Sequence, residues 1–229
     1  MALPTIYSCG SLSSYREKIY NKNLVYINKI NSLNLTYQLG LTPYTDMTSS
    51  EFTSSQVGCI THPLLRPERD TKQSISKAFT SPPKSVDWRE MNVISPVQSQ
   101  GDCGSCYAFA VVGAIESSLA MKTGQLNQYS VQQIVDCSKS YGNSGCLGGA
   151  FAYTYTYIME HGLTTEENYP YEGEFKQCKN VTAVIGIESY ELVAAGDESV
   201  LDQYVAKQPV AVTLSASSAS FQVCAFLCG

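Results

Sequence analysis

The sequence has no long hydrophobic run. Hydrophobic side chains make up 44% of its 229 residues, an ordinary share for a globular protein. No apolar segment approaches the roughly 18 residues of a membrane span. The N-terminal segment has neither a basic start nor the apolar core of about 7–15 residues that a secretory signal needs. We therefore expect no membrane partner, and a chain that buries one sizeable core or two modest ones.

Basic residues are also in short supply. The chain has 15 Lys and Arg against 20 Asp and Glu, which gives a formal net charge of −5 at pH 7. A surface that binds phosphates needs a basic stripe, whereas the charges here are spread along the chain. Nucleic acid is therefore excluded as the main partner, and a solvated acidic surface is the simpler interpretation.

Cysteine, by contrast, is abundant. Nine Cys in 229 residues is a high number for a reducing cytosol and a reasonable one for an oxidising compartment. Two Asn-x-Thr acceptor patterns, at Asn34 and Asn180, point the same way, although such short motifs often arise by chance. A cysteine set of this kind without a visible signal is inconsistent, and truncation at the front of the chain would explain it.

Helical patterns come first along the chain and strand patterns come later. Apolar residues recur mostly every three or four positions over residues 12–31, which predicts one helix. The other expected helices are at 106–121, 130–135, 150–160 and 198–207, and the expected strands are at 184–193 and 209–214. This is an α+β order. A stretch rich in Ser, Thr and Pro, from Thr48 to Lys84, suits an extended linker.

A cysteine pair at positions 103 and 106 lies directly before a predicted helix. Half of a zinc site is disfavoured, because Cys137, Cys146 and Cys178 stand singly rather than as a second close pair. A thioredoxin-like redox pair would need a strand leading into the motif and a βαβ pattern around it, and neither is visible.

A cysteine nucleophile at a helix N-terminus fits this segment best. The partial positive charge of the helix and its free backbone N–H groups favour thiolate over thiol at Cys106. The small residues Gly104 and Ser105 allow a substrate backbone to approach the sulfur. The amide of Gln100 can donate to the oxyanion of a tetrahedral intermediate. We expect no cofactor and no metal.

The order Cys-Gly-Ser-Cys-Tyr at residues 103–107 resembles the signature of papain and the cathepsins. Other segments of this family are matched by residues 83–89 at the mature start, 146–149 in a Cys-x-Gly-Gly element and 169–173 in a Tyr-Pro-Tyr segment. The inhibitory propeptide helix is matched by the spacing of Arg16, Tyr20, Asn23, Ile27 and Asn31, and a second propeptide motif by residues 40–46. The sequence is thus similar to papain-like cysteine peptidases from residue 16 to 222, and closest to their cathepsin L-like branch.

The resemblance implies an α+β, papain-like two-domain fold with the helical left domain largely present and the β-rich right domain mostly missing. It implies an inhibitory propeptide at residues 12–60, a linker with the activation cleavage at 61–81, and a peptidase domain at 82–229 that is truncated on its C-terminal side. The last residues, 223–229, depart from the family pattern. Val210 and Val212 would then lack a partner sheet and form an aggregation-prone edge.

The same resemblance assigns roles to individual residues. Cys106 would be the nucleophile and Gln100 the oxyanion donor. Gly149 would lend backbone hydrogen bonds to an extended substrate, and Thr213 would line the pocket for the substrate residue two before the cut. Tyr107 stands where Trp is commoner and keeps an aromatic side chain beside the sulfur.

Two disulfides follow from the resemblance as well. Cys103 would pair with Cys146, and Cys137 with Cys178, each closing a loop of about forty residues that stabilises by roughly 3–4 kcal/mol in the chain-entropy model. The resemblance assigns no partners to the remaining cysteines apart from Cys106, which are Cys9, Cys59, Cys224 and Cys228.

Histidine is scarce, with two residues in the chain. A papain-type thiolate needs a His that takes its proton and an Asn that orients the ring, about 130–150 residues after the cysteine. That spacing lies beyond residue 229. His62 falls in the linker, and His161 is expected to cap the last carbonyls of a helix. We therefore expect the catalytic His and Asn to be absent and the chain as given to be inactive.

The function implied by the resemblance is a cysteine-type endopeptidase made as a zymogen. It would be a lysosomal or secreted monomer that cuts proteins or peptides and is held inactive by its own propeptide. The alternative is a non-catalytic inhibitor or decoy that binds other papain-like peptidases. A thiol oxidoreductase would require Cys103 and Cys106 to form a reducible pair.

Overall fold

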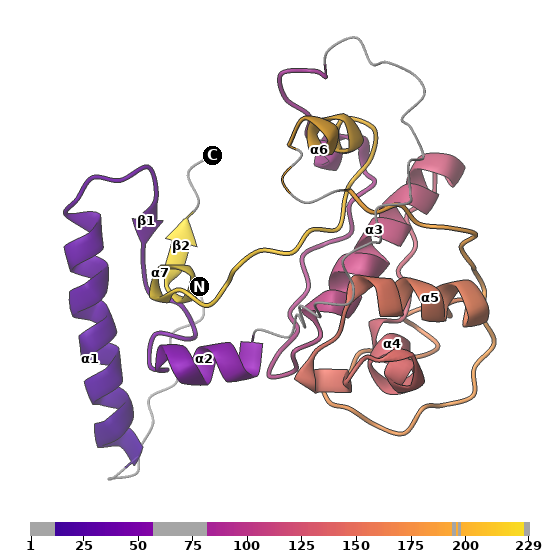
Figure 1. Ribbon diagram of the computed structural model, residues 1–229. Coiled ribbons are helices and arrows are strands. Elements are labelled where there is room, and N and C mark those ends of the chain that lie inside the picture. The colour runs from indigo at the N-terminus through magenta and orange to yellow at the C-terminus, as the bar shows by residue number, and fades with distance from the viewer. Residues whose placement is uncertain (1–11, 57–81, 194–195, 197, 227–229) are drawn as a thin grey trace. The chain divides into compact units, whose positions relative to one another are not determined.

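The computed structural model describes residues 12–56, 82–193, 196 and 198–226 (Figure 1). The chain divides into two compact units, one made of Met1–Val57 with Leu214–Gly229 and the other of Gly58–Thr213. Each unit has a buried cluster of its own. Among the described residues, no helix combines the length and the apolar character that a membrane crossing requires.

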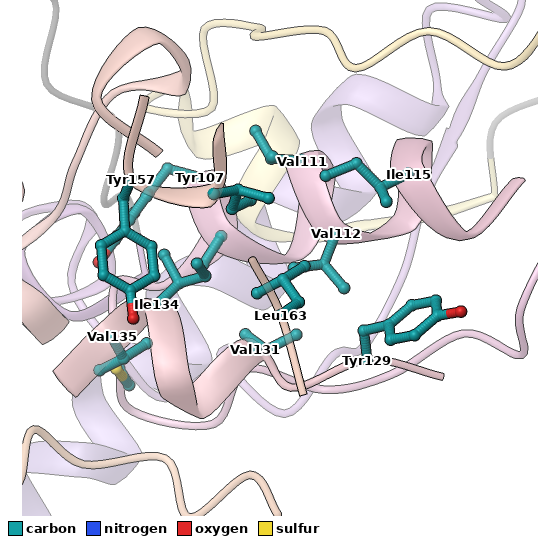
Figure 2. Close-up of a cluster of buried hydrophobic side chains, with 13 residues drawn as sticks. Tyr107, Val111, Val112, Ile115, Tyr129, Val131, Ile134, Val135, Tyr157 and Leu163 are labelled. Atoms are coloured by element: carbon teal, nitrogen blue, oxygen red, sulfur yellow. The ribbon is translucent and has the colours of Figure 1, made fainter. Parts of the chain in front are cut away.

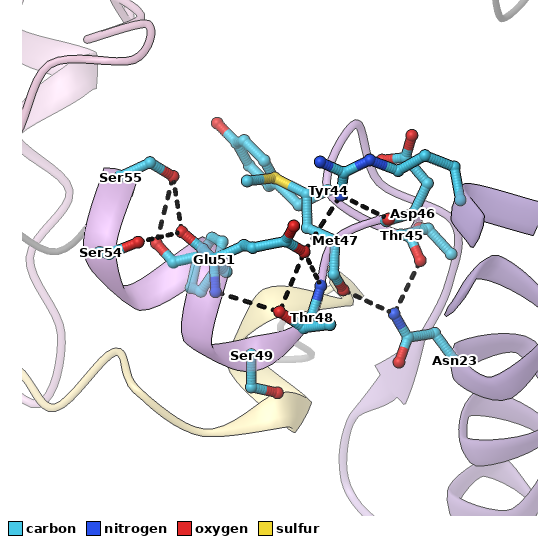
Figure 3. Close-up of polar contacts among 12 residues, drawn as sticks. Asn23, Tyr44, Thr45, Asp46, Met47, Thr48, Ser49, Glu51, Ser54 and Ser55 are labelled. Atoms are coloured by element: carbon cyan, nitrogen blue, oxygen red, sulfur yellow. Dashed lines mark hydrogen bonds and ion pairs between the residues drawn. The ribbon is translucent and has the colours of Figure 1, made fainter. Parts of the chain in front are cut away.

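The first unit is built on α1 (Leu12–Asn31), which has the predicted bounds. Its polar side chains fix the segment that follows. The Asn31 amide donates to the carbonyl of Leu39 at 2.8 Å and accepts from the N–H of Leu39 at 2.8 Å. The Asn23 amide donates to the carbonyls of Thr45 at 2.7 Å and Met47 at 3.0 Å (Figure 3). Two residues of the predicted propeptide pattern thus bind backbone rather than solvent.

The polar stretch expected as a linker begins with a helix, α2 (Ser49–Gln56). A capping box starts it, in which the Thr48 N–H donates to the Glu51 carboxylate at 2.7 Å and the Glu51 N–H donates to the Thr48 hydroxyl at 3.2 Å (Figure 3). Phe52 is buried and anchors the helix. The expectation of an extended Thr48–Lys84 was therefore wrong for this part. Residues 57–81 lie outside the described residues.

Chain from the C-terminal region completes the first unit. Strand β1 (Gln38–Leu39) pairs antiparallel with β2 (Cys224–Phe226), and Gln38 lies opposite Phe226. Val223, just before β2, is buried against Ile27 and Leu39. A short apolar core thus joins segments from the two ends of the described chain.

The short helix α7 (Ala219–Gln222) ends in a buried glutamine. The Gln222 amide donates to the carbonyls of Tyr44 at 2.8 Å and Met47 at 2.7 Å. Its own carbonyl accepts from the Thr42 hydroxyl at 2.9 Å. Because backbone carbonyls without a partner are costly when buried, Gln222 and the loop before α2 stabilise each other.

We expect acid to loosen the first unit through Glu51. Hydrogen bonds from Thr48, followed by the charge of Arg16 at 3.1 Å, hold the pKa of Glu51 below its ordinary 4.5. Because the folded-state pKa is the lower one, this carboxylate stabilises the fold above about pH 4.5 and stops doing so as the pH falls through the lowered value. Glu51→Gln should flatten an acid titration of helicity measured by far-UV circular dichroism. Identical titrations of the two proteins would contradict this role.

The second unit packs three helices around one core (Figure 2). These are α3 (Cys106–Thr123), α4 (Val131–Cys137) and α5 (Phe151–His161), which match the predicted helices within about two residues. The shorter turns η2, η3 and η4 (Trp88–Met91, Ser138–Tyr141, Gly145–Leu147) and the helix α6 (Glu198–Val205) complete it. Helix α6 begins at the predicted residue 198 and ends two residues before the predicted 207. Val111, Val112 and Ile134 are almost fully buried between the helices (Figure 2).

Helix α4 begins with one half of a capping box. The Ser130 hydroxyl accepts from the N–H of Gln133 at 2.9 Å. The Gln133 side chain does not return to Ser130. It accepts from the N–H of Thr164 at 2.9 Å and donates to the Tyr157 hydroxyl at 3.1 Å and the Gly162 carbonyl at 3.2 Å. Gln133 therefore joins α4 to the end of α5.

Gln133→Ala should cost about 2–3 kcal/mol of unfolding free energy, because it leaves buried backbone and hydroxyl groups without partners. Urea unfolding followed by fluorescence of Trp88 reports the second unit, since Trp88 is the one Trp of the chain and donates to the Val205 carbonyl at 2.8 Å. The exposed Gln125→Ala is the matched control and should change little. Equal losses in the two variants would contradict the role of Gln133.

Helix α5 ends at His161, one residue beyond the predicted bound, and Gly162 is its C-cap. The role of His161 differs from the expectation. Gly162 has φ +67° and donates its N–H to the carbonyl of Ile158 at 2.8 Å. His161 was expected to cap the last carbonyls. Its Nε2 instead lies 2.8 Å from the Tyr141 hydroxyl, and its ring packs on Tyr157. Two neighbouring tyrosines, Tyr141 and Tyr157, therefore contact the His161 ring.

The two expected strands at 184–193 and 209–214 do not form, and this prediction was wrong. Ile185 makes only an isolated bridge with Leu163, in which the N–H of Leu163 donates to Ile185 at 2.9 Å. Val184 and Val212 are more than half exposed. Their sequence pattern fits strands, but beyond the bridge between Leu163 and Ile185 no described segment pairs with them, so no ladder of hydrogen bonds forms.

Candidate active site

Cys106 is the first residue of α3 and is partly exposed. It forms no disulfide with a described cysteine. Ser105 before it is fully buried, and its carbonyl accepts from the N–H groups of Ala108 at 2.9 Å and Phe109 at 3.1 Å. The thiol therefore lies at the end of a long, core-packed helix, where the helix dipole favours a negative charge.

The segment before Cys106 is anchored by a disulfide between Cys103 and Cys146. The N–H of Gly104 also donates to the carbonyl of Cys146 at 2.9 Å. A second disulfide joins Cys137, the last residue of α4, to Cys178. The structure thus contains the two pairs that the family resemblance implies.

Gln100 lies in the loop that approaches the thiol. Its amide donates to the carbonyl of Cys103 at 2.9 Å, which orients the side chain along the loop. The backbone carbonyl of Gln100 accepts a hydrogen bond from the Tyr171 hydroxyl at 2.8 Å. The same hydroxyl also shares a hydrogen bond of 2.6 Å with the Ser105 hydroxyl. Tyr171 therefore ties Gln100 to the start of α3.

Tyr171 and Ser105 had no positioning role in the sequence-based prediction. The Tyr-Pro-Tyr match located Tyr171, but only as a family marker. Its ring also packs edge-on against Phe109 of α3, with ring centres 4.8 Å apart. No periodic pattern links residue 171 to residue 100, so the hydrogen bond could not be predicted from spacing.

Cys106 and Gln100 line one open hollow of about 470 Å³. Its walls also include Phe109, Val131 and Val210. The structure therefore brings the expected nucleophile and oxyanion donor together.

Thr213 does not line the hollow of Cys106. It lies on an adjacent, larger hollow of about 890 Å³, whose walls include Leu119 and Tyr155. Neighbouring residues of the same segment, Pro209 and Val210, line both hollows. In this arrangement Thr213 is apart from the thiol.

Gly149 is buried in tight surroundings. A Cβ at this position would lie 2.4 Å from the Asn143 amide oxygen and 2.6 Å from the ring of Tyr107. The Tyr107 hydroxyl donates to the carbonyl of Gly145 at 3.1 Å, and burial raises the pKa of that phenol. Tyr107 is thus a core residue, with its ring against Gly149 and its hydroxyl bonded within the core rather than directed at the hollow.

No histidine lines the hollow of Cys106 among the described residues. His62 lies outside them, and His161 is bonded to Tyr141. Glu116 lines the hollow too, but it lies ten residues along α3, about 15 Å from Cys106 by helical rise. It is nearly fully buried and accepts from the Tyr129 N–H at 2.8 Å. No described cluster of His, Cys, Asp or Glu could hold a metal ion.

A cysteine at the start of a core helix, a glutamine in the same hollow and a further unit built on the N-terminal helix α1 are the features of a peptidase domain of the papain class with its propeptide. The sequence model of the papain family cysteine proteases matches residues 82–225, and that of the cathepsin propeptide inhibitor domain (I29) matches residues 6–52. The chain belongs to the papain family of cysteine proteases.

Curated relatives agree with this assignment. Germination-specific cysteine protease 1 of Arabidopsis thaliana is 38% identical over 217 residues, which cover 90% of this chain and 57% of the relative. Cathepsin L of Sarcophaga peregrina is 39% identical over 222 residues, covering 91% of this chain and 65% of the relative. The chain therefore spans less than two thirds of the length of either protein.

Solved proforms share the fold. The proform of the ragweed pollen cysteine protease Amb a 11 superimposes with a TM-score of 0.86 at 33% identity, covering 96% of this chain and 62% of that one. A recombinant stem bromelain precursor gives 0.81 at 31% identity, covering 96% and 70%. The predicted family and the predicted fold class are confirmed. The helical part of the α+β fold is largely present, and the β-rich part is mostly absent from the described residues.

Proposed function

We propose that this chain carries the propeptide and the nucleophile-bearing half of a cysteine endopeptidase that is made as a zymogen. The observation that carries the proposal is the Cys106 thiol at the N-terminus of α3, in one hollow with Gln100. The proposed limits are a propeptide at 12–60, an activation linker at 61–81 and a peptidase domain at 82–229.

In the proposed reaction, the Cys106 thiolate attacks the carbonyl carbon of a peptide bond and forms a tetrahedral intermediate. The Gln100 amide, which lines the same hollow, would donate to the resulting oxyanion in exchange for its contact with the Cys103 carbonyl. Collapse of the intermediate expels the amine and leaves an acyl-enzyme, which water hydrolyses. The thiol proton must pass to a histidine base that the described hollow does not contain.

Substrate binding is proposed for two further positions. Gly149 would lend backbone hydrogen bonds to an extended peptide, as the resemblance to the family implies, and in the present structure it is buried beside Asn143 and Tyr107. Thr213 is exposed in the present structure. In a protein in which residues 209–214 pair as a strand, Thr213 would contact the substrate residue two before the cut. A lysosomal or secreted location fits the two disulfides, and the proposed working form is a monomer.

A chimaera tests the peptidase proposal. Residues 1–222 would be joined to the corresponding C-terminal part of the Sarcophaga peregrina cathepsin L, which is 39% identical over the shared region. After cleavage of the linker, the chimaera should hydrolyse a Phe-Arg amide, and Cys106→Ala should abolish this. Gln100→Ala should lower turnover by about 10²–10³. A folded chimaera whose activity survives Cys106→Ala would overturn the proposal.

A second function is supported by the match to the propeptide inhibitor domain and by the separate core of the first unit. The chain would then act in trans as a non-catalytic inhibitor or decoy for other papain-like peptidases. Titration of the purified chain against an active cathepsin L is the test. Sub-micromolar inhibition that Asn23→Ala weakens would support this function, and full cathepsin activity at high chain concentration would exclude it.

A further inference from the structure

Asn180 lies in a solvent-exposed loop of the second unit. Asn180 and Thr182 are both exposed, and the segment around them is neither helix nor strand. Neither side chain forms a hydrogen bond with any described residue. Among the described residues, the non-glycine positions with positive φ are Asn34 and Asn92, so the backbone at 180 imposes no demand for asparagine.

Firm anchors flank this loop. On one side, Cys178 is held in its disulfide and the Lys179 N–H donates to the Tyr169 hydroxyl at 3.2 Å. On the other side, the Val184 N–H donates to the Leu163 carbonyl at 2.8 Å. The tripeptide between them is therefore displayed from a fixed base, and a large group attached to Asn180 would extend into solvent without displacing the core.

Asn34 lies in a similar place in the first unit. Residues 34–36, which connect α1 to β1, are all exposed. Asn34 has φ +49°, a left-handed conformation that asparagine tolerates better than most residues. Its N–H donates to the Asn31 carbonyl at 3.3 Å, which closes the turn after α1. The left-handed backbone at this position is by itself a sufficient reason for an asparagine. A test of modification at Asn34 must therefore leave Asn34 itself unchanged.

We propose that Asn180 and Asn34 are acceptors of N-linked oligosaccharide. Both lie in Asn-x-Thr triplets without proline, and both triplets occupy exposed loops of a chain whose described part holds two disulfides. The inference goes beyond the proposed proteolysis and depends only on passage through the secretory route. The glycans would shield one loop on each unit.

The co-reactant is an oligosaccharide linked to a polyprenyl pyrophosphate, supplied by the secretory membrane. The carboxamide nitrogen of Asn180 attacks the anomeric carbon of the first sugar. A carbon–nitrogen bond forms, the carbon–oxygen bond to the pyrophosphate breaks, and the lipid pyrophosphate leaves with the electron pair. The amide nitrogen gives up one proton, and no redox change occurs. The triplet threonine, Thr182 here, completes the recognition pattern.

The experiment sends the full chain into the secretory pathway of a eukaryotic cell behind a cleavable leader. Peptides of the secreted protein are analysed by mass spectrometry before and after treatment with peptide N-glycosidase. We expect the peptides containing Asn180 and Asn34 as glycopeptides, each converted to an aspartate peptide by the enzyme. An unmodified peptide at either position overturns the proposal for that position.

Threonine variants give matched controls that keep both asparagines. Thr182→Ala should remove the glycan at Asn180 alone, and Thr36→Ala the glycan at Asn34 alone. Thr182→Ser and Thr36→Ser retain the acceptor pattern and should retain the glycans. Unchanged glycan content in the alanine variants would overturn the assignment. The chimaera's hydrolysis requires no glycan, so the two proposals fail separately.

Discussion

A polypeptide of these 229 residues is expected to leave a Phe-Arg amide substrate uncut. Cys106 is in place, but the described hollow around it holds no histidine to take its proton. In serine peptidases, loss of the histidine alone costs on the order of 10⁶ in turnover. Without a base to take the proton, the thiol is a much weaker nucleophile than the thiolate. Glu116 cannot replace the base, because it is buried about 15 Å along the helix from the thiol.

The measurement is hydrolysis of the amide by the purified chain after cleavage of the linker, with Cys106→Ala as the matched control. Both proteins should be indistinguishable from buffer, whereas the chimaera with the cathepsin L part should turn over under the same conditions. Hydrolysis by the chain itself that disappears in Cys106→Ala would show that another group serves as the base.

Gly149→Ala is expected to unfold or strongly destabilise the second unit. The added methyl would lie 2.4 Å from the Asn143 amide oxygen, which already accepts from the N–H of Ala150 at 2.9 Å. It would also meet the ring of Tyr107, which the hydroxyl contact with Gly145 holds in place. Neither neighbour is the free end of a flexible side chain. Overpacking costs roughly 1–3 kcal/mol of unfolding free energy and occasionally more, and contacts as short as these place Gly149→Ala at the upper end.

The control is Gly113→Ala in α3, where nothing lies within 4 Å of the added methyl. That substitution should stabilise the helix by about 0.5–1 kcal/mol, because alanine has the higher helix propensity. Urea unfolding of both variants is followed by Trp88 fluorescence. Equal stability of Gly149→Ala and the parent would show that the packing around Gly149 relaxes at no cost.

The helices were predictable because their cause is local. The spacing of apolar residues alone placed α1 and α3 within two residues of their bounds. Helix α2 was not predicted, because its Ser- and Thr-rich composition suggested a linker, although Thr48 and Glu51 have the spacing of a capping box. A search for caps rather than composition would have found it.

The strand predictions were wrong because a strand depends on a partner segment that is not its neighbour in the sequence. Residues 184–193 have the right side chains for a strand, but a strand requires hydrogen bonds from a neighbour. In the described chain, the pairing of this segment is limited to the isolated bridge between Leu163 and Ile185. The pairing of β1 with β2 escaped for the same reason, since nothing in a two-residue strand indicates that Leu39 lies opposite Cys224.

The sequence indicated which residues belong to the candidate active site, but not the hydrogen bonds that connect them. The motif around Cys106 indicated the nucleophile and the neighbouring Gln100, and both line one hollow. The tie between them passes through Tyr171, seventy-one residues beyond Gln100. Such a contact depends on how two loops meet in space, which the spacing of residues in the sequence does not encode.

The composition of the first unit has a consequence for synthesis on the ribosome. Its strand β1 pairs with β2, and its loop before α2 accepts hydrogen bonds from the Gln222 amide. Both partners lie near the C-terminal end of the described chain. The core of the second unit, from Cys103 to Leu163, is complete much earlier. A chain that emerges from its N-terminus therefore finishes its second unit first and its first unit last. Until β2 is synthesised, β1 lacks its pairing partner and presents an unpaired strand edge.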